Sequence, residues 1–222
     1  MELYLVRHAV TGANLSYRLI GRSDPPLHAL GRRSARQLGR RLRHEPIVCI
    51  ACSPLKRAVQ TAEAIRLAYT PKYRPPLVID RDLREIDLGE IDGMSAFDAY
   101  VSHRDLLERA LAPDAPDTFA FPGGERRNDA LGRFDHALQT LLKAYPDGHV
   151  AVITHGGPIG LFLARLFGQP LAAFRSLTPQ HASLTRLRLE GDQPVLLLEQ
   201  EGVRHLSASL LLAIEQSRAA HR

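Results

Sequence analysis

Tryptophan is absent from this 222-residue chain, and cysteine and methionine occur only twice each. Lysine is also scarce: it occurs only at positions 56, 72 and 143, so arginine carries nearly all of the positive charge. No apolar run approaches the ~20 residues that a membrane-spanning helix requires, so we expect no membrane partner. The hydrophobic content of 45% is ordinary for a globular protein with a substantial core.

The two cysteines lie three residues apart, a spacing that can indicate a redox pair or metal ligands. Both fall in the apolar segment 46–52, which we expect to be a buried strand. Residues three apart on a strand face opposite ways and lie ~10 Å apart, too far for a disulfide. Two ligands do not make a zinc site either. We therefore predict that Cys49 and Cys52 are buried free thiols and that the chain has no metal site.

The net charge is +5, and a basic balance suits either anionic substrates or nucleic acid. No nucleic-acid recognition motif is present and aromatic residues do not alternate with the arginines, so we expect no nucleic-acid partner. One row of arginines recurs at helical spacing, and it predicts either a solvated helix face or a patch for acidic partners. This row consists of Arg32, Arg36, Arg40 and Arg43.

The length suits one α/β domain over residues 1–222, with room for an inserted subdomain. The chain opens directly on an expected strand, without the features of a secretory signal, and we therefore expect a cytoplasmic protein. No internal repeat, low-complexity segment or linker divides the sequence.

The opening apolar segment, 3–6, ends abruptly in Arg7 and His8. An apolar run rich in residues that favour β-strands, followed directly by polar residues, predicts a buried strand and then a loop. Loops at the C-terminal ends of parallel strands are where open α/β sheets bind ligands. Thr11 and Asn14 follow in the same loop. A cation, an imidazole, a hydroxyl and an amide brought together there suit an anionic, tetrahedral group.

A second expected strand, 47–52, is followed by Ser53 and Pro54. Serine is a good helix N-cap and proline suits the first helical position, so we expect a helix to begin there. Arg57 then falls in the first turn, where the positive end of the helix dipole disfavours a cation. An anion bound nearby would remove that conflict, because helix N-termini are ready anion sites.

The segment 150–157 repeats the opening design. A wholly apolar strand ends in His155, then Gly156, and a helix is expected over 158–167. The Gly156 amide at this junction can point at a ligand. A functional role for His155 is therefore favoured over a structural one.

The segment 83–93 is rich in acids and contains two glycines, so local propensity alone predicts a solvated loop. Its acids include Glu85, Asp87 and Glu90. The residues alone do not single out one of them as a proton donor.

These motifs together resemble the signature of the histidine phosphatase superfamily, the group that includes cofactor-dependent phosphoglycerate mutases. The matching stretches are Val-Arg-His-x-x-Thr-x-x-Asn from position 6, Ser-x-Leu-x-Arg-Ala-x-Gln-Thr-Ala from 53, Leu-x-Glu-x-x-x-Gly-x-x-x-Gly from 83, Pro-Gly-Gly-Glu from 122 and His-Gly at 155. The resemblance runs from residue 3 to about residue 189. It implies a three-layer α/β/α sandwich with a mostly parallel central sheet and an inserted helical lid over 93–127.

The resemblance also implies a metal-independent phosphatase that needs no cofactor and acts on a small phosphate ester through a phosphohistidine. The implied catalytic residues are Arg7, His8, Arg57, Glu85 and His155. The implied substrate-binding residues are Arg7, Thr11, Asn14, Gly21, Arg57, His155 and Gly156. Near the lid, the candidates for reading the rest of the substrate are Arg104, Arg109, Arg126 and Arg127.

The chain departs from the family pattern in its opening loop. Ala9 stands where the family usually has glycine, which bears on how closely the loop backbone approaches a phosphate. Thr11 and Ala13 stand where the related mutases usually have serine and tryptophan, which favours a phosphatase. Two alternatives stay open: a mutase that returns the phosphoryl group to another hydroxyl, and a non-catalytic protein that binds phosphorylated ligands. The assembly is open too, with a homodimer as one candidate.

The remaining patterns predict further helices over 31–44, 95–111 and 128–144. They predict strands at 77–79, 182–189 and 195–198, and a helix-like tail over 205–222.

Overall fold

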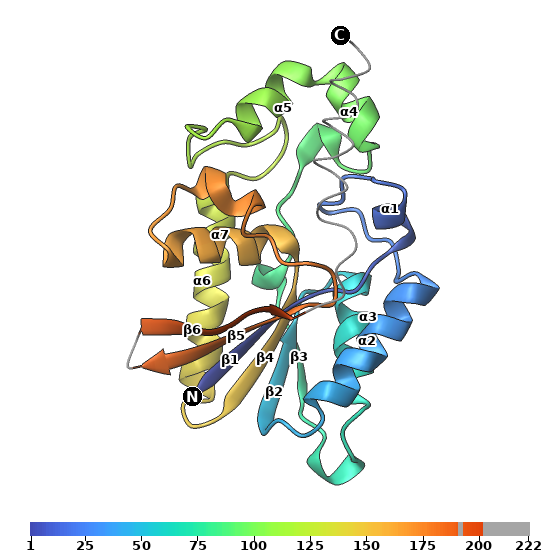
Figure 1. The fold of residues 1–222 in the computed structure, drawn as a ribbon, viewed down its shortest axis with the longest axis vertical. Helices are drawn as coiled ribbons and strands as arrows, with labels where there is room; N and C mark the ends of the chain where they lie inside the picture. The colour runs from blue at the N-terminus through green and yellow to red at the C-terminus, as the bar shows by residue number, and fades with distance from the viewer. Residues whose placement is uncertain (191–192, 202–222) are drawn as a thin grey trace.

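The structure is a computed structural model that describes residues 1–190 and 193–201 (Figure 1). Its centre is a six-stranded sheet with the order β3-β2-β4-β1-β5-β6. The strands are β1 (Glu2–Arg7), β2 (Ile47–Cys52), β3 (Leu77–Ile79), β4 (His149–Thr154), β5 (Leu184–Glu190) and β6 (Gln193–Glu201). The first four pair in parallel, whereas β5 is antiparallel to β1 and β6 is antiparallel to β5. The prediction of a mostly parallel sheet is confirmed.

Helices cover both faces of this sheet. Apolar side chains of α2 (Ala29–Leu42) and α3 (Lys56–Arg66) pack with Tyr4 and Val6 on one face. Those of α6 (Arg127–Ala144) and α7 (Gly156–Leu166) pack with Leu3 and Leu5 on the other. Figure 1 shows the resulting three layers, with the sheet between the two helix pairs. The predicted α/β/α sandwich is therefore correct.

Alternation along β2 separates the two cysteines. Cys49 belongs to the core on the α6 and α7 face, and Cys52 to the core on the α2 and α3 face. Both are free and buried, as predicted. Burial raises the pKa of the Cys52 thiol to about 12, so this side chain is an inert apolar filler at neutral pH.

The lid segment, residues 93–127, carries α4 (Ala96–Ser102) and α5 (Arg104–Leu111). It has a small apolar core of its own, and it lies beyond the C-terminal ends of the parallel strands (Figure 1). The expectation of one helix over 95–111 is wrong, because His103 leaves helical geometry with φ −132° and ψ 37°. The Ser102 hydroxyl contacts both the Asp98 carbonyl and the His103 ring, and such local bonds compete with helix continuation.

Other element boundaries shift by up to three residues. The helix expected over 31–44 is α2, which begins two residues earlier because the His28 ring accepts the Leu30 N–H. The short helices are α1 (Gly12–Leu15) and the 3-10 turns η1 (Pro71–Tyr73), η2 (Arg81–Leu83), η3 (Gly89–Ile91) and η4 (Leu171–Arg175). The arginine row on α2 is exposed, in agreement with a solvated face. The tail expected over 205–222 lies outside the described residues.

Two glycines in helices provide a matched stability test. A Cβ added at Gly31 in α2 would lie 2.1 Å from the carbonyl oxygen of Val10, whereas one added at Gly132 in α6 would meet nothing within 4 Å. We expect Gly31→Ala to lower the free energy of unfolding by about 1–3 kcal/mol through overpacking. Gly132→Ala should be neutral or stabilising, because alanine favours helix. Urea unfolding of both variants measures the difference, and equal stabilities would contradict this account of the α2 contact.

None of the helices within residues 1–190 and 193–201 is long and apolar enough to cross a membrane.

Candidate active site

The two histidine motifs meet at neighbouring strand ends. Arg7 at the end of β1 pairs with Thr154 at the end of β4, so His8 and His155 leave the sheet side by side. The His8 amide donates to the Thr154 carbonyl at 2.9 Å. The centroids of the two imidazole rings lie 5.0 Å apart. Parallel pairing thus joins residues that are far apart in the sequence.

His8 is 3% exposed, and its Nδ1 lies 2.8 Å from the Ala9 carbonyl oxygen. Because a carbonyl oxygen only accepts, the proton of the neutral ring belongs on Nδ1, and Nε2 keeps its lone pair. Burial, and then the charges of Arg57 and Arg7, hold the pKa of His8 well below its ordinary value. His8 is therefore a neutral imidazole at pH 7, as a nucleophile must be.

Ala9 fits where a glycine is usual. It is fully buried against Leu27, Ala35 and Ala182, and its N–H donates to the Thr61 hydroxyl at 3.0 Å. Its backbone does not adopt the positive φ that favours glycine. The methyl group therefore packs into the core without strain.

Arg57 is fully buried in the first turn of α3. Its Nη1 donates to the Ser23 carbonyl at 2.7 Å and its Nη2 to the Gly21 carbonyl at 2.9 Å. Burial lowers its pKa, and nearby carboxylates, Glu85 first, act in the opposite direction. The two carbonyls fix the plane of the guanidinium before any ligand arrives.

The loop that carries these carbonyls is itself held by a carboxylate. Asp92 accepts the Gly21 N–H at 2.6 Å and both the N–H and the hydroxyl of Ser23, at 2.8 and 2.7 Å. Both backbone groups of Gly21 thus have partners, and the structure assigns Gly21 to the support of Arg57. Its predicted direct contact with substrate stays a prediction.

The helix start at α3 differs from expectation. The helix begins at Lys56, and the Lys56 N–H donates to the Asp24 carboxylate at 2.6 Å. Ser53 is not the N-cap: its hydroxyl lies 2.7 Å from Nε2 of His155 and accepts the Leu55 N–H. Asp24 therefore supplies part of the negative charge that we expected a bound anion to supply at this helix N-terminus.

His155 is fully buried, and burial together with Arg57 lowers its pKa well below the ordinary value. With Nε2 engaged by Ser53, its Nδ1 has no hydrogen-bond partner in the described part of the chain. Gly156 is the first residue of α7, a position whose N–H has no helical partner. A Cβ on Gly156 would lie 3.0 Å from Cζ of Arg7, so glycine lets the guanidinium lie against the helix start.

Among the acids of its segment, Glu85 is the one on which the charges of both Arg57 and Arg7 act. Its carboxylate accepts the Ile86 N–H at 2.9 Å and lies 3.4 Å from the Gly157 N–H. Burial raises its pKa, and Arg57 and Arg7 are the charges that oppose the rise. Asp87 instead accepts the Gly89 N–H, and Glu90 is exposed.

Arg133 holds the backbone around Glu85. It forms a two-pronged ion pair with Glu125, at 2.7 and 2.8 Å, and donates to the carbonyls of Asp82, Arg84 and Glu85. No local pattern distinguished Arg133 or Asp92 as supports, because the backbone groups they hold are more than 45 residues away in sequence.

Thr11 and Asn14 bond to each other. The Asn14 Oδ1 accepts both the Thr11 N–H, at 3.0 Å, and the Thr11 hydroxyl, at 2.8 Å. This leaves the Asn14 amide NH₂ as the donor that can face a ligand. A direct phosphoryl contact of either residue stays a prediction.

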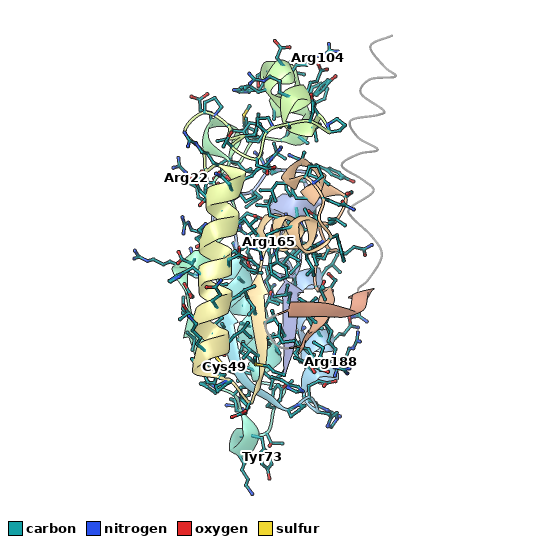
Figure 2. The ribbon with its side chains drawn as sticks, turned by 90° about the vertical axis from the view of Figure 1, so that its left-hand side faces the viewer. Arg22, Cys49, Tyr73, Arg104, Arg165 and Arg188 are labelled. Atoms are coloured by element: carbon teal, nitrogen blue, oxygen red, sulfur yellow. The ribbon has the colours of Figure 1, made fainter. Side chains whose placement is uncertain are left out.

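The lid arginines do not gather around His8 as a set. Arg104 is exposed, pairs with Glu108 at 3.1 Å and lies at the far end of the lid segment (Figure 2). Arg127 is 4% exposed, donates to the Ala110 carbonyl and lies over the rings of Phe119 and Phe174. Arg127 therefore anchors the lid segment, which differs from the expected role in reading substrate. Arg109 and Arg126 are exposed.

Three buried nitrogens of this cluster lack partners among the described residues. They are Nε of Arg7, Nε of Arg57 and Nδ1 of His155. Buried polar atoms are nearly always hydrogen-bonded, and two close guanidinium groups repel each other. A tetrahedral anion bound here would offer acceptor oxygens to such nitrogens and offset the charge of the two guanidinium groups.

Comparison with known proteins agrees with this chemistry. A model of the histidine phosphatase superfamily (branch 1) matches residues 3–201. A probable phosphoglycerate mutase GpmB of Salmonella choleraesuis is 31% identical over 215 residues, which cover 95% of this chain and 97% of that protein. The chain therefore belongs to the histidine phosphatase superfamily.

Solved structures narrow the class further. Bacillus stearothermophilus YhfR has a TM-score of 0.81 and 28% identity, and the match covers 91% of this chain and 98% of that one. The mycobacterial glucosyl-3-phosphoglycerate phosphatase Rv2419c, in complex with VO3, has a TM-score of 0.77 and 26% identity, with 89% and 97% covered. Within its superfamily, the chain is a phosphoric monoester hydrolase.

Proposed function

We propose that this protein hydrolyses a small phosphomonoester through a phosphohistidine on His8, without a metal ion. The observation that carries the proposal is the buried His8 ring, held through Nδ1 with Nε2 free, 5.0 Å from the His155 ring and under the charges of Arg57 and Arg7. Neutral imidazole is a competent nucleophile, and fixed cationic donors can stabilise the equatorial charge of the transition state.

The reaction takes two steps. Nε2 of His8 attacks phosphorus, the bond from phosphorus to the ester oxygen breaks, and Glu85 gives its proton to the departing alkoxide. Water then attacks the phosphohistidine, Glu85 takes a proton from that water, and the nitrogen–phosphorus bond breaks to release phosphate. Arg7, Arg57 and His155 hold the phosphoryl oxygens through both steps.

Transfer to an alcohol is a second candidate activity beside hydrolysis, because the GpmB relatives that cover nearly the whole chain are named probable phosphoglycerate mutases. The same phosphohistidine would then pass its phosphoryl group to an alcohol. Two features favour water as acceptor: Thr11 and Ala13 in the opening loop, and the likeness to the phosphatase Rv2419c.

Hydrolysis of p-nitrophenyl phosphate near pH 6, with a chelator present, tests the proposal. We expect turnover that added Mg²⁺ does not increase. The same reaction with glycerol in excess separates the two candidates, since a mutase transfers phosphate to the added alcohol and a phosphatase releases it. Loss of turnover in the chelator would overturn the metal-free mechanism.

The pH dependence tests Glu85. The first step needs neutral His8 and protonated Glu85, and the second needs ionised Glu85. Burial raises the pKa of Glu85, so the protonated form persists to higher pH than usual and is lost as pH rises through that pKa. We expect a bell-shaped profile, with the acid limb below pH ~6.5 because the pKa of His8 is depressed. A flat profile from about pH 4 to 9 would count against Glu85 as the acid.

Glu85→Gln should reduce turnover by an amount that depends on the leaving group of the ester. Alkyl phosphates need protonation of the departing oxygen, so we expect their turnover to fall ~10²–10⁴-fold, with loss of the alkaline limb. The first step with p-nitrophenyl phosphate should slow less, because p-nitrophenolate is a good leaving group that does not need a proton. Glu90→Gln, at an exposed position of the same segment, is the matched control. Equal losses for both ester types would remove Glu85 from the acid role.

A further inference from the structure

A third imidazole lies beside the nucleophile. His181 precedes β5, and its ring centroid lies 5.2 Å from that of His8, with an angle of 66° between the ring planes. His155 lies 5.0 Å away from the same ring. His8 therefore has two histidine neighbours, and neither the motif analysis nor the mechanism above uses His181.

The backbone fixes this third ring in place. Arg7 donates from Nη1 to the Pro179 carbonyl at 2.7 Å, and the Ala182 N–H donates to the carbonyls of Arg7 and His8, at 3.1 and 3.2 Å. Ala182 has φ 55°, a conformation that costs free energy in a residue with a Cβ. The turn is thus tied to the end of β1 through residues on both sides of His181. One of these residues, Ala182, has the strained backbone conformation.

The His181 ring has an unused nitrogen. Its Nε2 is shielded from solvent and has no hydrogen-bond partner within residues 1–190 and 193–201. The charged and titratable groups that act on it are Arg7 and His8 from the end of β1 and Arg57 from α3. Arg7 and Arg57 each also carry a buried Nε without a partner, and His8 is the proposed nucleophile.

Packing alone does not account for this arrangement. A histidine used only as an apolar filler would leave a buried polar atom unsatisfied, which is costly. Metal binding does not account for it either, because the part of the chain that the structure describes has no group of three side chains arranged to hold a metal. A phosphoryl oxygen is an acceptor that would satisfy Nε2 together with the neighbouring orphan nitrogens.

We propose that His181 is a further catalytic residue, whose Nε2–H donates a hydrogen bond to a phosphoryl oxygen during transfer to His8. This inference rests on the proposed phosphoryl site. Burial and the neighbouring cations lower the pKa of His181 in the free protein, so the ring is neutral there. A dianionic phosphoryl group reverses the local charge, and the ring takes a proton from solvent as the anion binds. The resulting imidazolium strengthens the bond to the oxygen that gains charge in the transition state.

The test measures binding of inorganic phosphate by calorimetry at pH 7, in two buffers with different heats of ionisation, which gives the number of protons taken up. We expect His181→Asn to bind phosphate on the order of 10- to 100-fold more weakly, the scale of one hydrogen bond to a charged group. We also expect the variant to take up fewer protons than the wild type. His136→Asn, on an exposed face of α6, should match the wild type in both.

A second variant controls for loss of phosphate binding that is caused by a folding defect. His181→Gln keeps an N–H donor of similar reach but cannot be protonated. We expect it to recover part of the phosphate affinity without the proton uptake. Thermal melting without ligand shows whether each variant is folded.

The outcomes separate this inference from the proposed function. Folded His181 variants that bind phosphate with wild-type affinity and proton uptake would overturn the role of His181, even if the wild type forms a phosphoenzyme. Weakened binding with reduced proton uptake would support it, even if the wild type forms no phosphoenzyme and the proposed hydrolysis fails. Weakened binding with unchanged proton uptake would reduce His181 to a positioning residue and overturn the proton step.

Discussion

Replacing His8 by alanine is expected to abolish both turnover and the covalent phosphoenzyme. The His8 ring is held through Nδ1, which leaves Nε2 available for attack, and burial with the charges of Arg57 and Arg7 keeps it neutral. We expect the rate with p-nitrophenyl phosphate to fall at least ~10⁴-fold, since loss of the nucleophile removes the covalent route entirely. A labelled ester, quenched in alkali where phosphohistidine survives, measures the phosphoenzyme directly.

His8→Asn guards against a folding defect. The asparagine amide can replace Nδ1–H as donor to the Ala9 carbonyl, which lies 2.8 Å from the native ring, yet it offers no nucleophile. It should melt near the wild-type temperature and remain inactive. His136→Ala should keep full activity. Labelled phosphate found on either His8 variant would move the nucleophile to another residue, and His155 and His181 are then the candidates to replace next.

The sequence could predict the site because its main residues follow strands. Arg7, His8 and His155 come directly after wholly apolar runs, and parallel pairing brings the ends of such runs to one edge of the sheet. The hydrophobic pattern alone therefore predicts that these three residues lie at one edge of the sheet. The family resemblance was needed for Glu85, because only the fold shows that Glu85 faces Arg57 while Glu90 is exposed.

Local rules failed where a distant partner decided the outcome. Ser53 has the sequence context of an N-cap, but His155 arrives from 102 residues away and takes its hydroxyl. Arg127 sits at a helix start near the lid, but two aromatic rings and the Ala110 carbonyl hold it there. His181 gave no signal, since its partners lie at the other end of the chain. Each of these three misses concerns a contact between segments that no short pattern encodes.

Arg57→Ala is expected to reduce kcat/KM at least ~100-fold, the scale of one preorganised donor at a charged transition state. The guanidinium costs nothing to orient during the reaction, because Ser23 and Gly21 already hold it through their carbonyls. Arg57→Lys should recover little, since a single ammonium cannot bond both carbonyls and a phosphoryl oxygen in the same geometry. Arg66→Ala, at the other end of α3, removes an arginine whose partner is Glu63, and it should stay within a few-fold of wild type. Near-wild-type activity in Arg57→Ala would remove Arg57 from the pocket.

The pH profile of Arg57→Ala distinguishes this role from a general loss of stability. Arg57 lowers the pKa of His8 and also lowers the pKa of Glu85. Without this cation both values rise, so His8 becomes protonated at higher pH and Glu85 keeps its proton to higher pH. Both limbs of the activity profile should therefore move to higher pH in Arg57→Ala. Arg57→Lys keeps the charge, so its profile should stay near that of the wild type even though its rate is low. A profile that does not move in Arg57→Ala would mean that Arg57 does not act electrostatically on the reacting groups.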